Sequence, residues 1–118
     1  MTPQDFFKND LFAERAGIVL MEVREGYSKA RLEIKKEHLN AGNRTQGGAI
    51  FTLADLALAA AANSHGQLAF SLSSNITFLR ASGIGDTLYA EARERYIGRS
   101  TGSVSYTHLR AHETGRNL

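Results

Sequence analysis

The hydrophobic positions of this chain recur with two different periods, and a change of period marks the boundary of an expected element. Within residues 3–16 the large apolar side chains fall at helical spacing; they are Phe6, Phe7, Leu11 and Phe12. This spacing predicts a short amphipathic helix that lies on a larger body and ends at Gly17.

A β-hairpin is expected next. Residues 17–24 are rich in β-forming side chains, residues 27–35 alternate between apolar and polar, and Glu25-Gly26 between them is typical of a turn. On the alternating strand one face carries the apolar side chains Ala30, Leu32 and Ile34. The other face carries the charged side chains Lys29, Arg31, Glu33 and Lys35. The hairpin is therefore predicted to bury one face.

The longest apolar segment of the chain predicts a central helix. Residues 36–46 are expected to form a polar loop, and residues 47–63 a helix with Gly66 as its stop. Apart from Thr52 and Asp55, the interior of this helix is apolar on all sides. Such a helix is expected to be buried on all sides.

Three more strands are expected after this helix, at residues 69–79, at residues 86–97 and from Ser103 onward. The order of elements predicts an α+β domain in which an antiparallel sheet wraps one central helix. Residues 108–118 are polar and basic and do not alternate. We therefore expect the domain to occupy residues 1–105, and residues 106–118 to form an atypical, disordered tail.

Composition narrows the class of protein. A chain of 118 residues with 42% hydrophobic and 22% charged content suits one globular domain. The net charge is +2 with scattered basic residues, which does not favour nucleic acid as a partner. No cysteine is present, which excludes disulfides and thiolate metal sites. The acidic start argues against a signal peptide, and the apolar run at residues 49–62 is shorter than the roughly 20 residues of a membrane span. A cytoplasmic protein is expected.

Asp55 is the main candidate for chemistry, because burying an unpaired carboxylate in an apolar helix is costly. One interpretation is structural, with Asp55 hydrogen-bonded to nearby backbone or to Thr52 one turn earlier. The other interpretation is that Asp55 faces a ligand cavity.

The start of the same helix offers a second feature. Gln46-Gly47-Gly48 leaves the first amide N–H groups bare, which favours a developing negative charge, although the glycines alone could serve only a tight turn. Asn40, in the loop just before, can donate and accept hydrogen bonds. Gly47 and Asp55 lie eight residues apart, about 12 Å along a helix. If both act on one carbonyl, two copies of the helix must meet antiparallel across a twofold axis, and the site is shared between subunits.

These residues resemble the motif of hotdog-fold thioesterases of the phenylacetic-acid-degradation (PaaI-like) group. That motif has the form H-x-N, a glycine, [HQ]-G-G-x-x-F-x-L-A-D. The matching residues here are His38, Asn40, Gly42, Gln46, Gly47, Gly48, Phe51, Leu53, Ala54 and Asp55. The resemblance continues through SSNITFLRASGIGDTLYAEARERYIGRSTG and covers roughly residues 10–105.

The resemblance implies a hotdog fold, a homodimer or dimer of dimers, and hydrolysis of acyl-CoA thioesters without metal or bound cofactor. It implies that Asp55 attacks the thioester carbonyl or activates water, and that the amide of Gly47 polarises that carbonyl. It implies that Asn40 helps to place the reacting groups. Gln46 stands where many members have His, and it would orient a group by hydrogen bonding.

Other residues are candidates for substrate binding. Gly48 is a candidate because it lies at the helix start. The polar side of the strand expected at residues 69–79 is a candidate to line the pantetheine channel; its residues are Ser73, Asn75 and Thr77. The alternative is that this side is an ordinary solvent-exposed face. Four residues in turns that come after expected strands are candidates to bind the phosphates of CoA: Arg80, Arg99, Ser100 and Thr101. The alternative is that these side chains are simply solvated at the surface. His65 is interpreted as a helix-end residue rather than a catalytic base.

The C-terminus departs from the family pattern. Members continue after the equivalent of Val104 with a long strand, a turn and a final apolar strand, whereas this chain has SVSYTHLRAHETGRNL. The final strand is therefore expected to be missing or replaced, as in a truncated gene product. Besides an acyl-CoA thioesterase, three hypotheses stay open: a non-catalytic acyl-CoA-binding module, an inactive truncated member, and a hotdog dehydratase, which pairs a His with the acid. The motif does not define the acyl group.

Overall fold

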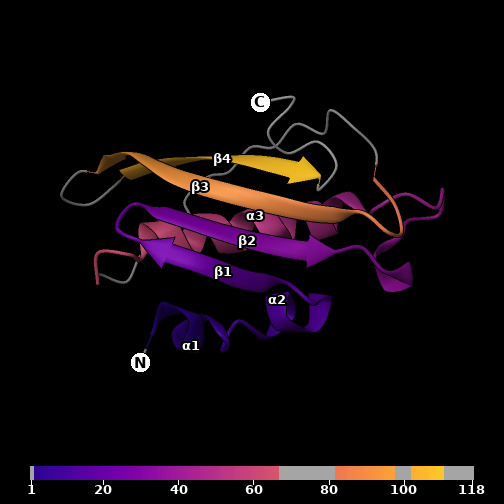
Figure 1. Ribbon diagram of the computed structural model, residues 1–118, viewed down its shortest axis with the longest axis horizontal. Helices are drawn as coiled ribbons and strands as arrows, with labels where there is room; N and C mark the ends of the chain where they lie inside the picture. The colour runs from indigo at the N-terminus through magenta and orange to yellow at the C-terminus, as the bar shows by residue number, and fades with distance from the viewer. Residues whose placement is uncertain (1, 67–81, 98–101, 111–118) are drawn as a thin grey trace.

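The computed structural model describes residues 2–66, 82–97 and 102–110. The elements follow in the order α1 (Pro3–Phe7), α2 (Leu11–Ala16), β1 (Val19–Arg24), β2 (Tyr27–Glu33), the 3₁₀ turn η1 (Lys36–His38), α3 (Gly47–Ala62), β3 (Thr87–Ile97) and β4 (Gly102–Arg110). The strands form one antiparallel sheet in the order β1-β2-β3-β4. Figure 1 shows α3 across one face of the sheet, with α1 and α2 along the β1 edge. The predicted α+β arrangement of a sheet around one helix is confirmed.

The core lies between α3 and the inner face of the sheet. Ala30 of β2 pairs with Ala90 of β3, Leu32 pairs with Leu88, and all four side chains are fully buried. The buried side chains that α3 adds to this core are Ile50, Leu53, Leu56, Ala57 and Ala61. Because alanine carries only a methyl group, the alanines on both sides let the helix pack closely against the sheet.

Ser28 is the polar exception within this core. Its side chain is fully buried, and its Oγ donates a hydrogen bond to the backbone carbonyl of Ala57 at 2.5 Å. A buried hydroxyl without a partner would be costly, so this bond satisfies it. The bond is also a directed contact between β2 and α3.

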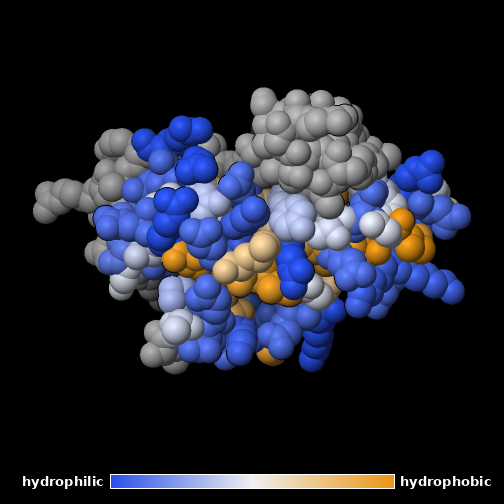
Figure 2. Space-filling model, in the orientation of Figure 1, coloured by the Kyte–Doolittle hydropathy of each residue, from blue (hydrophilic) through white to orange (hydrophobic). Residues whose placement is uncertain are grey.

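The predicted hairpin is confirmed. Arg24 pairs with Tyr27 across the Glu25-Gly26 turn, and Ala30, Leu32 and Ile34 are buried as expected. The face of the molecule in Figure 2 is largely hydrophilic, with hydrophobic residues gathered in a band between the N-terminal helices and the strands. Val19 and Met21 of β1 are 44% and 42% exposed.

The N-terminal segment differs from its prediction. Residues 3–16 form two short helices, α1 and α2, rather than one. The chain breaks because Asp10 caps a new helix: its side chain accepts a hydrogen bond from the N–H of Ala13 at 3.1 Å. Gly17 ends α2 as predicted, with a φ of +89°.

The domain boundary at residue 105 is wrong. Strand β4 continues to Arg110, which pairs with Leu88, so residues 106–110 belong to the sheet. A strand is held by backbone hydrogen bonds to its neighbour, and these do not require alternating side chains. Residues 111–118, the rest of the predicted tail, lie outside the described residues.

Helix α3 begins at Gly47 as predicted, and two other expectations about it are corrected. It ends at Ala62 with Asn63 as its C-cap, so Gly66 lies beyond the stop. It is not buried on all sides, because Asp55 is exposed and both Phe51 and Thr52 are half-buried. The four described strands cover one side of the helix.

Two expectations concern parts of the chain that are not described. The strand at residues 69–79 falls outside the described residues, as does most of the turn before Ser103. Among the described residues, no helix has both the length and the apolar character that crossing a membrane requires.

Gly17 provides a test of the α2–β1 junction. A Cβ at this position would come no closer than 4.0 Å to Leu32, so any cost of Gly17→Ala comes from the left-handed backbone alone. We expect a loss of about 1 kcal/mol in the free energy of unfolding, which lowers the thermal midpoint by roughly 4 °C. Gly17→Asn is the matched control, because Asn tolerates this conformation, and it should lose less. Equal loss in both variants would contradict this account.

Candidate active site

The start of α3 is held from outside the helix. Gln46 is the N-cap, with an extended backbone and no side-chain capping bond. Its N–H donates to the carbonyl of His38 at 2.7 Å, and its own carbonyl accepts from the N–H of Ala49 at 2.9 Å. The N–H groups of Gly47 and Gly48 have no hydrogen-bond partner among the described residues. Free amides at the positive end of a 16-residue helix favour a negatively charged group.

Packing against the described residues of the same chain does not require Gly48 to be a glycine. The group that a Cβ there would approach is the Cγ of Gln46 at 3.9 Å, an ordinary contact. Gly48 is also exposed. The alternative in which the glycines serve only a tight turn is not favoured at Gly48, because it lies inside the helix, where alanine is the better residue.

Asn40 shapes the loop that precedes the helix. Its Oδ1 accepts from the N–H of Gly42 at 2.9 Å and from the N–H of Arg44 at 3.1 Å. Its backbone N–H donates to the carbonyl of Arg44 at 2.7 Å. The accepting half of the side-chain amide is therefore used inside the loop, and the donating half has no partner among the described residues. Asn40 can offer a donor to a ligand, but not the acceptor that the sequence also suggested.

The loop is fastened at its far end by a buried polar pair. The N–H of Thr45 donates to the carbonyl of Ser82 at 2.8 Å, and the hydroxyl of Ser82 donates to that of Thr45 at 2.7 Å. Ser82 lies just before β3, so this contact ties the loop to the sheet. The helix start is thus placed by the hairpin on one side and by the approach to β3 on the other.

Asp55 lies about two turns further along α3. Its carboxylate has no hydrogen bond or ion pair among the described residues. Thr52 does not bond to it, because the Thr52 hydroxyl donates to the carbonyl of Gly48 at 2.7 Å. Partial burial raises the pKa of the Asp55 carboxyl above its usual value, and the negative charge of Asp10 on α2 raises this pKa further. A carboxylate with a raised pKa and no partner fits the interpretation of a ligand-facing group better than the structural one.

The two ends of the candidate site are separated along one straight element. Gly47 and Asp55 belong to the same continuous helix, which puts them about 12 Å apart along its axis. A single carbonyl cannot lie within about 3 Å of both. One copy of the chain therefore holds two half-sites rather than one complete site.

The structure brings together only some of the predicted site residues. Asn40, Gln46, Gly47 and Gly48 gather at the start of α3, and Asp55 stands apart. The remaining predicted binding residues lie outside the described residues; they are Ser73, Asn75, Thr77, Arg80, Arg99, Ser100 and Thr101. His65 lies beyond the helix end, where its Nε2 is 2.6 Å from Glu94, so it does not face Asp55.

The pattern of the sequence assigned no role to Asp10. Its capping bond to Ala13 holds its carboxylate at the start of α2, close enough to Asp55 for its charge to act there. In the sequence, Asp10 could be recognised only as a candidate helix cap, because it lies three residues before Ala13 in a helical pattern. This clue does not tell which residue of another element lies near Asp10.

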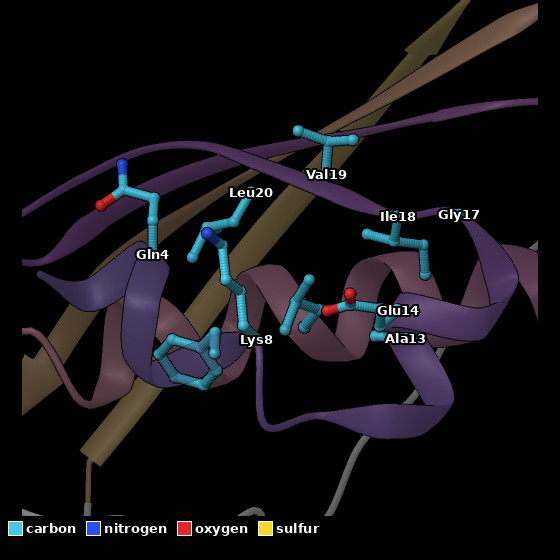
Figure 3. A pocket seen from close by; sticks show the side chains of 10 residues that line it. Gln4, Lys8, Ala13, Glu14, Gly17, Ile18, Val19 and Leu20 are labelled. Carbon is cyan, nitrogen blue, oxygen red and sulfur yellow. The ribbon is translucent and has the colours of Figure 1, made fainter.

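A cavity of about 320 Å³ lies between the N-terminal helices, β1 and α3 (Figure 3). Its apolar walls include Phe7, Ala13, Ile18, Leu20 and Leu56. Lys8, the residue just after α1, and Glu14 of α2 also line it. Among the described residues, no three His, Cys, Asp or Glu side chains converge as a metal site would require.

The comparison with protein families identifies the class of this protein. Residues 42–114 match the model of the thioesterase superfamily, which is more than half of the 118 residues. The chain belongs to the thioesterase superfamily, and the predicted resemblance to a PaaI-like hotdog thioesterase is confirmed.

Three relatives refine this assignment. The acyl-coenzyme A thioesterase PaaI of Escherichia coli is 38% identical over 96 residues, which are 81% of this chain and 69% of the relative. The structure of E. coli PaaI, a protein of the phenylacetic acid degradation operon, superposes with a TM-score of 0.88 at 33% identity, covering 92% of this chain and 78% of that one. The protein smu.793 of Streptococcus mutans, solved with acetyl CoA bound, has a TM-score of 0.77 at 29% identity, covering 80% and 77%.

The third relative, after E. coli PaaI and smu.793, is a candidate esterase of Archaeoglobus fulgidus. It is 47% identical over 95 residues, which are 80% of this chain. The chain spans 62% of the length of that relative. The shared structures confirm the hotdog fold: an antiparallel sheet that wraps a central helix.

Replacing Asp55 by Asn should stabilise the protein near neutral pH. Because the pKa of Asp55 is raised in the native state, the native protein binds its proton more tightly than the unfolded chain does. Ionising Asp55 therefore lowers the free energy of unfolding. This loss is absent at a pH below the pKa that Asp55 has in the unfolded chain, and it reaches its full size at a pH above the pKa that Asp55 has in the native protein. Chemical denaturation should show Asp55→Asn more stable than wild type at pH 7, with the difference shrinking as the pH falls through this window.

The control is Asp5→Asn. Hydrogen bonds from the backbone and side chain of Thr2 lower the pKa of Asp5, so its ionised form is the stabilising one. Its replacement should therefore change stability with the opposite sign near neutral pH. A loss of stability in Asp55→Asn at pH 7 would contradict the account of Asp55.

Proposed function

We propose that this protein is an acyl-CoA thioesterase, which hydrolyses a CoA thioester to a free acid and CoA. The observation that carries the proposal is that one helix holds a carboxylate, Asp55, and two amides, those of Gly47 and Gly48, that have no partner among the described residues. Membership of the thioesterase superfamily supports the reaction class. The CoA thioester substrate is supported by the name of the E. coli relative and by the acetyl CoA bound to the S. mutans protein.

Asp55 supplies the reacting oxygen or the base. As a base, it removes a proton from water, and the resulting hydroxide adds to the thioester carbonyl carbon. When the tetrahedral intermediate collapses, the C–S bond breaks and the CoA sulfur takes up the proton from Asp55. As a nucleophile, Asp55 itself adds to the carbonyl, CoA leaves, and water hydrolyses the resulting anhydride. In both cases the raised pKa of Asp55 gives a stronger base than an ordinary surface carboxylate.

The amide N–H of Gly47 stabilises the oxyanion. Negative charge develops on the carbonyl oxygen in the tetrahedral intermediate, and a fixed N–H at a helix N-terminus meets it without reorganising. The donating amide of Asn40, which lies in the adjoining loop, helps to orient the reacting groups. Gln46 and Gly48 bind the substrate at the same helix end.

The complete site forms between two copies of the chain. Since Gly47 and Asp55 of one copy are about 12 Å apart, the amide must come from a partner whose helix runs antiparallel. A surface suited to a partner is present: Leu11 and Phe12 of α2 are 63% and 73% exposed, and α3 leaves Phe51 and Thr52 half-buried. We infer a homodimer as the minimal active unit. A cytoplasmic location and a reaction that needs no metal or cofactor stay predictions.

The reaction is tested by replacing the carboxylate. Asp55→Ala should lower kcat by at least about a hundredfold, because it removes the general base or nucleophile. Release of free thiol from a panel of aryl-CoA and acyl-CoA esters measures the rate. A non-catalytic binding module would bind the same esters without turnover in the wild type. Unchanged turnover in Asp55→Ala, with the fold intact by circular dichroism, would refute the role of Asp55.

The sharing of the site is tested by complementation. Gly47→Pro removes the N–H, yet proline suits the first position of a helix, and Gln46 already has the extended backbone (φ −62°, ψ 132°) that precedes proline. Gly47→Pro and Asp55→Ala should each be inactive. Co-refolded in equal amounts, they should recover about a quarter of wild-type activity, because random pairing makes half of the dimers hybrid with one intact site each. No recovery in a mixture shown to contain hybrid dimers would contradict a shared site.

A further inference from the structure

His38 belongs to the motif at the helix start, and its buried ring contacts the backbone at two other points of the chain. The residue is 7% exposed. Its Nδ1 accepts a hydrogen bond from the N–H of Lys35 at 2.8 Å, and its Nε2 lies 2.6 Å from the carbonyl oxygen of Ala16. Lys35 lies two residues after the end of β2, and Ala16 is the last residue of α2. The ring thus bridges the hairpin and the N-terminal helices.

These contacts define the proton on the ring. A backbone N–H can only donate and a carbonyl can only accept, so Nδ1 is the acceptor and Nε2 carries the hydrogen. The neutral imidazole satisfies both partners. A side chain with donors but no acceptor would leave the N–H of Lys35 without its partner. A side chain with no polar group would leave both the N–H of Lys35 and the carbonyl of Ala16 without theirs.

The backbone of the same residue holds the helix start. The carbonyl of His38 accepts the N–H of Gln46 at 2.7 Å, one residue before the free amide of Gly47. The flanking residues Leu39 and Thr45 form an isolated antiparallel bridge that closes the loop containing Asn40. A shift of the His38 ring therefore moves both the loop and the first amides of α3, since the backbone contact passes through the residue that the ring anchors.

We propose that His38 is a positioning residue of the active site, which fixes the oxyanion-binding end of α3 and the Asn40 loop against β2 and α2. It does not touch the substrate; it acts through Gln46. The proposal rests on the proposed thioesterase function for its kinetic consequence, but the placement of the helix start can be measured without turnover.

Two conservative variants separate the two ring contacts. In His38→Asn, the side-chain oxygen can stand where Nδ1 stands and accept from Lys35, while the bond to Ala16 is lost. In His38→Gln, the side-chain NH₂ can reach the carbonyl of Ala16, while the bond to Lys35 is lost. His38→Ala loses both. The matched control is His65→Gln, which removes the 2.6 Å contact with Glu94 at the opposite end of α3.

The kinetic measurement separates positioning from a general loss of stability. We expect His38→Ala to lower kcat between about tenfold and a hundredfold, with KM changed by less than about threefold, since a displaced amide weakens transition-state stabilisation more than ground-state binding. His38→Asn and His38→Gln should fall between it and the wild type. His65→Gln should lower the thermal midpoint and leave kcat unchanged. If the His38 variants keep the wild-type kcat per folded molecule, the proposal is overturned.

Amide hydrogen exchange provides the readout that needs no substrate. The exchange of the Gln46 N–H, followed by NMR, should be at least about tenfold faster in His38→Asn and His38→Gln than in the wild type and in His65→Gln. Unchanged protection of Gln46 would overturn the proposal. If the wild type hydrolyses no CoA ester, the proposed function fails, while the exchange measurement still decides whether His38 holds the helix start.

Discussion

The packing of α3 against the four-stranded sheet is the contact on which the rest of the structure depends. The core consists of leucines, isoleucines and many alanines, with Ala30 and Ala90 on the sheet facing the alanine-rich side of the helix. This contact buries one side of α3 and determines which side remains open. Asp55 is on the open side, and the free amides are at one end. The chemical groups of the candidate site are therefore located by hydrophobic packing, and hydrogen bonds at the helix start then refine their position.

The periodicity of hydrophobic residues correctly predicted the elements whose sequence follows one strong hydrophobic pattern throughout. The alternation of Ala30, Leu32 and Ile34 defined the buried face of the hairpin, and the bounds of α3 followed from its apolar run. Periodicity failed where a single polar side chain competes with the pattern. Asp10 begins a new helix inside a segment whose phenylalanines keep helical spacing, and β4 continues through residues 108–110 by backbone pairing with β3 although those residues do not alternate. Capping and pairing are tertiary or local polar effects that hydropathy does not record.

The candidate site was predictable as a set of residues, but not as an arrangement. The motif identified Asn40, Gly47 and Asp55, and a helical rise was enough to show that the last two cannot meet within one chain. The loop geometry was not predictable. The side-chain oxygen of Asn40 accepts hydrogen bonds from Gly42 and Arg44, so that among the described residues only its side-chain NH₂ group is left without a partner. Nor did the sequence reveal that the charge of Asp10 acts on Asp55. Both facts depend on which segments the fold brings together. A partly buried acid without a partner among the described residues is a local cost to the native state that a reaction would justify.

The bond from Ser28 to the carbonyl of Ala57 has a consequence for the evolution of this site. A row of alanine methyls presents nearly the same surface after each turn, so van der Waals packing alone distinguishes poorly between neighbouring axial positions of the helix. One directed bond removes that degeneracy. Substitutions that enlarge or reshape the surroundings of α3 can then accumulate without sliding its reactive groups along the sheet, so that substrate preference can diverge while the chemistry stays in register.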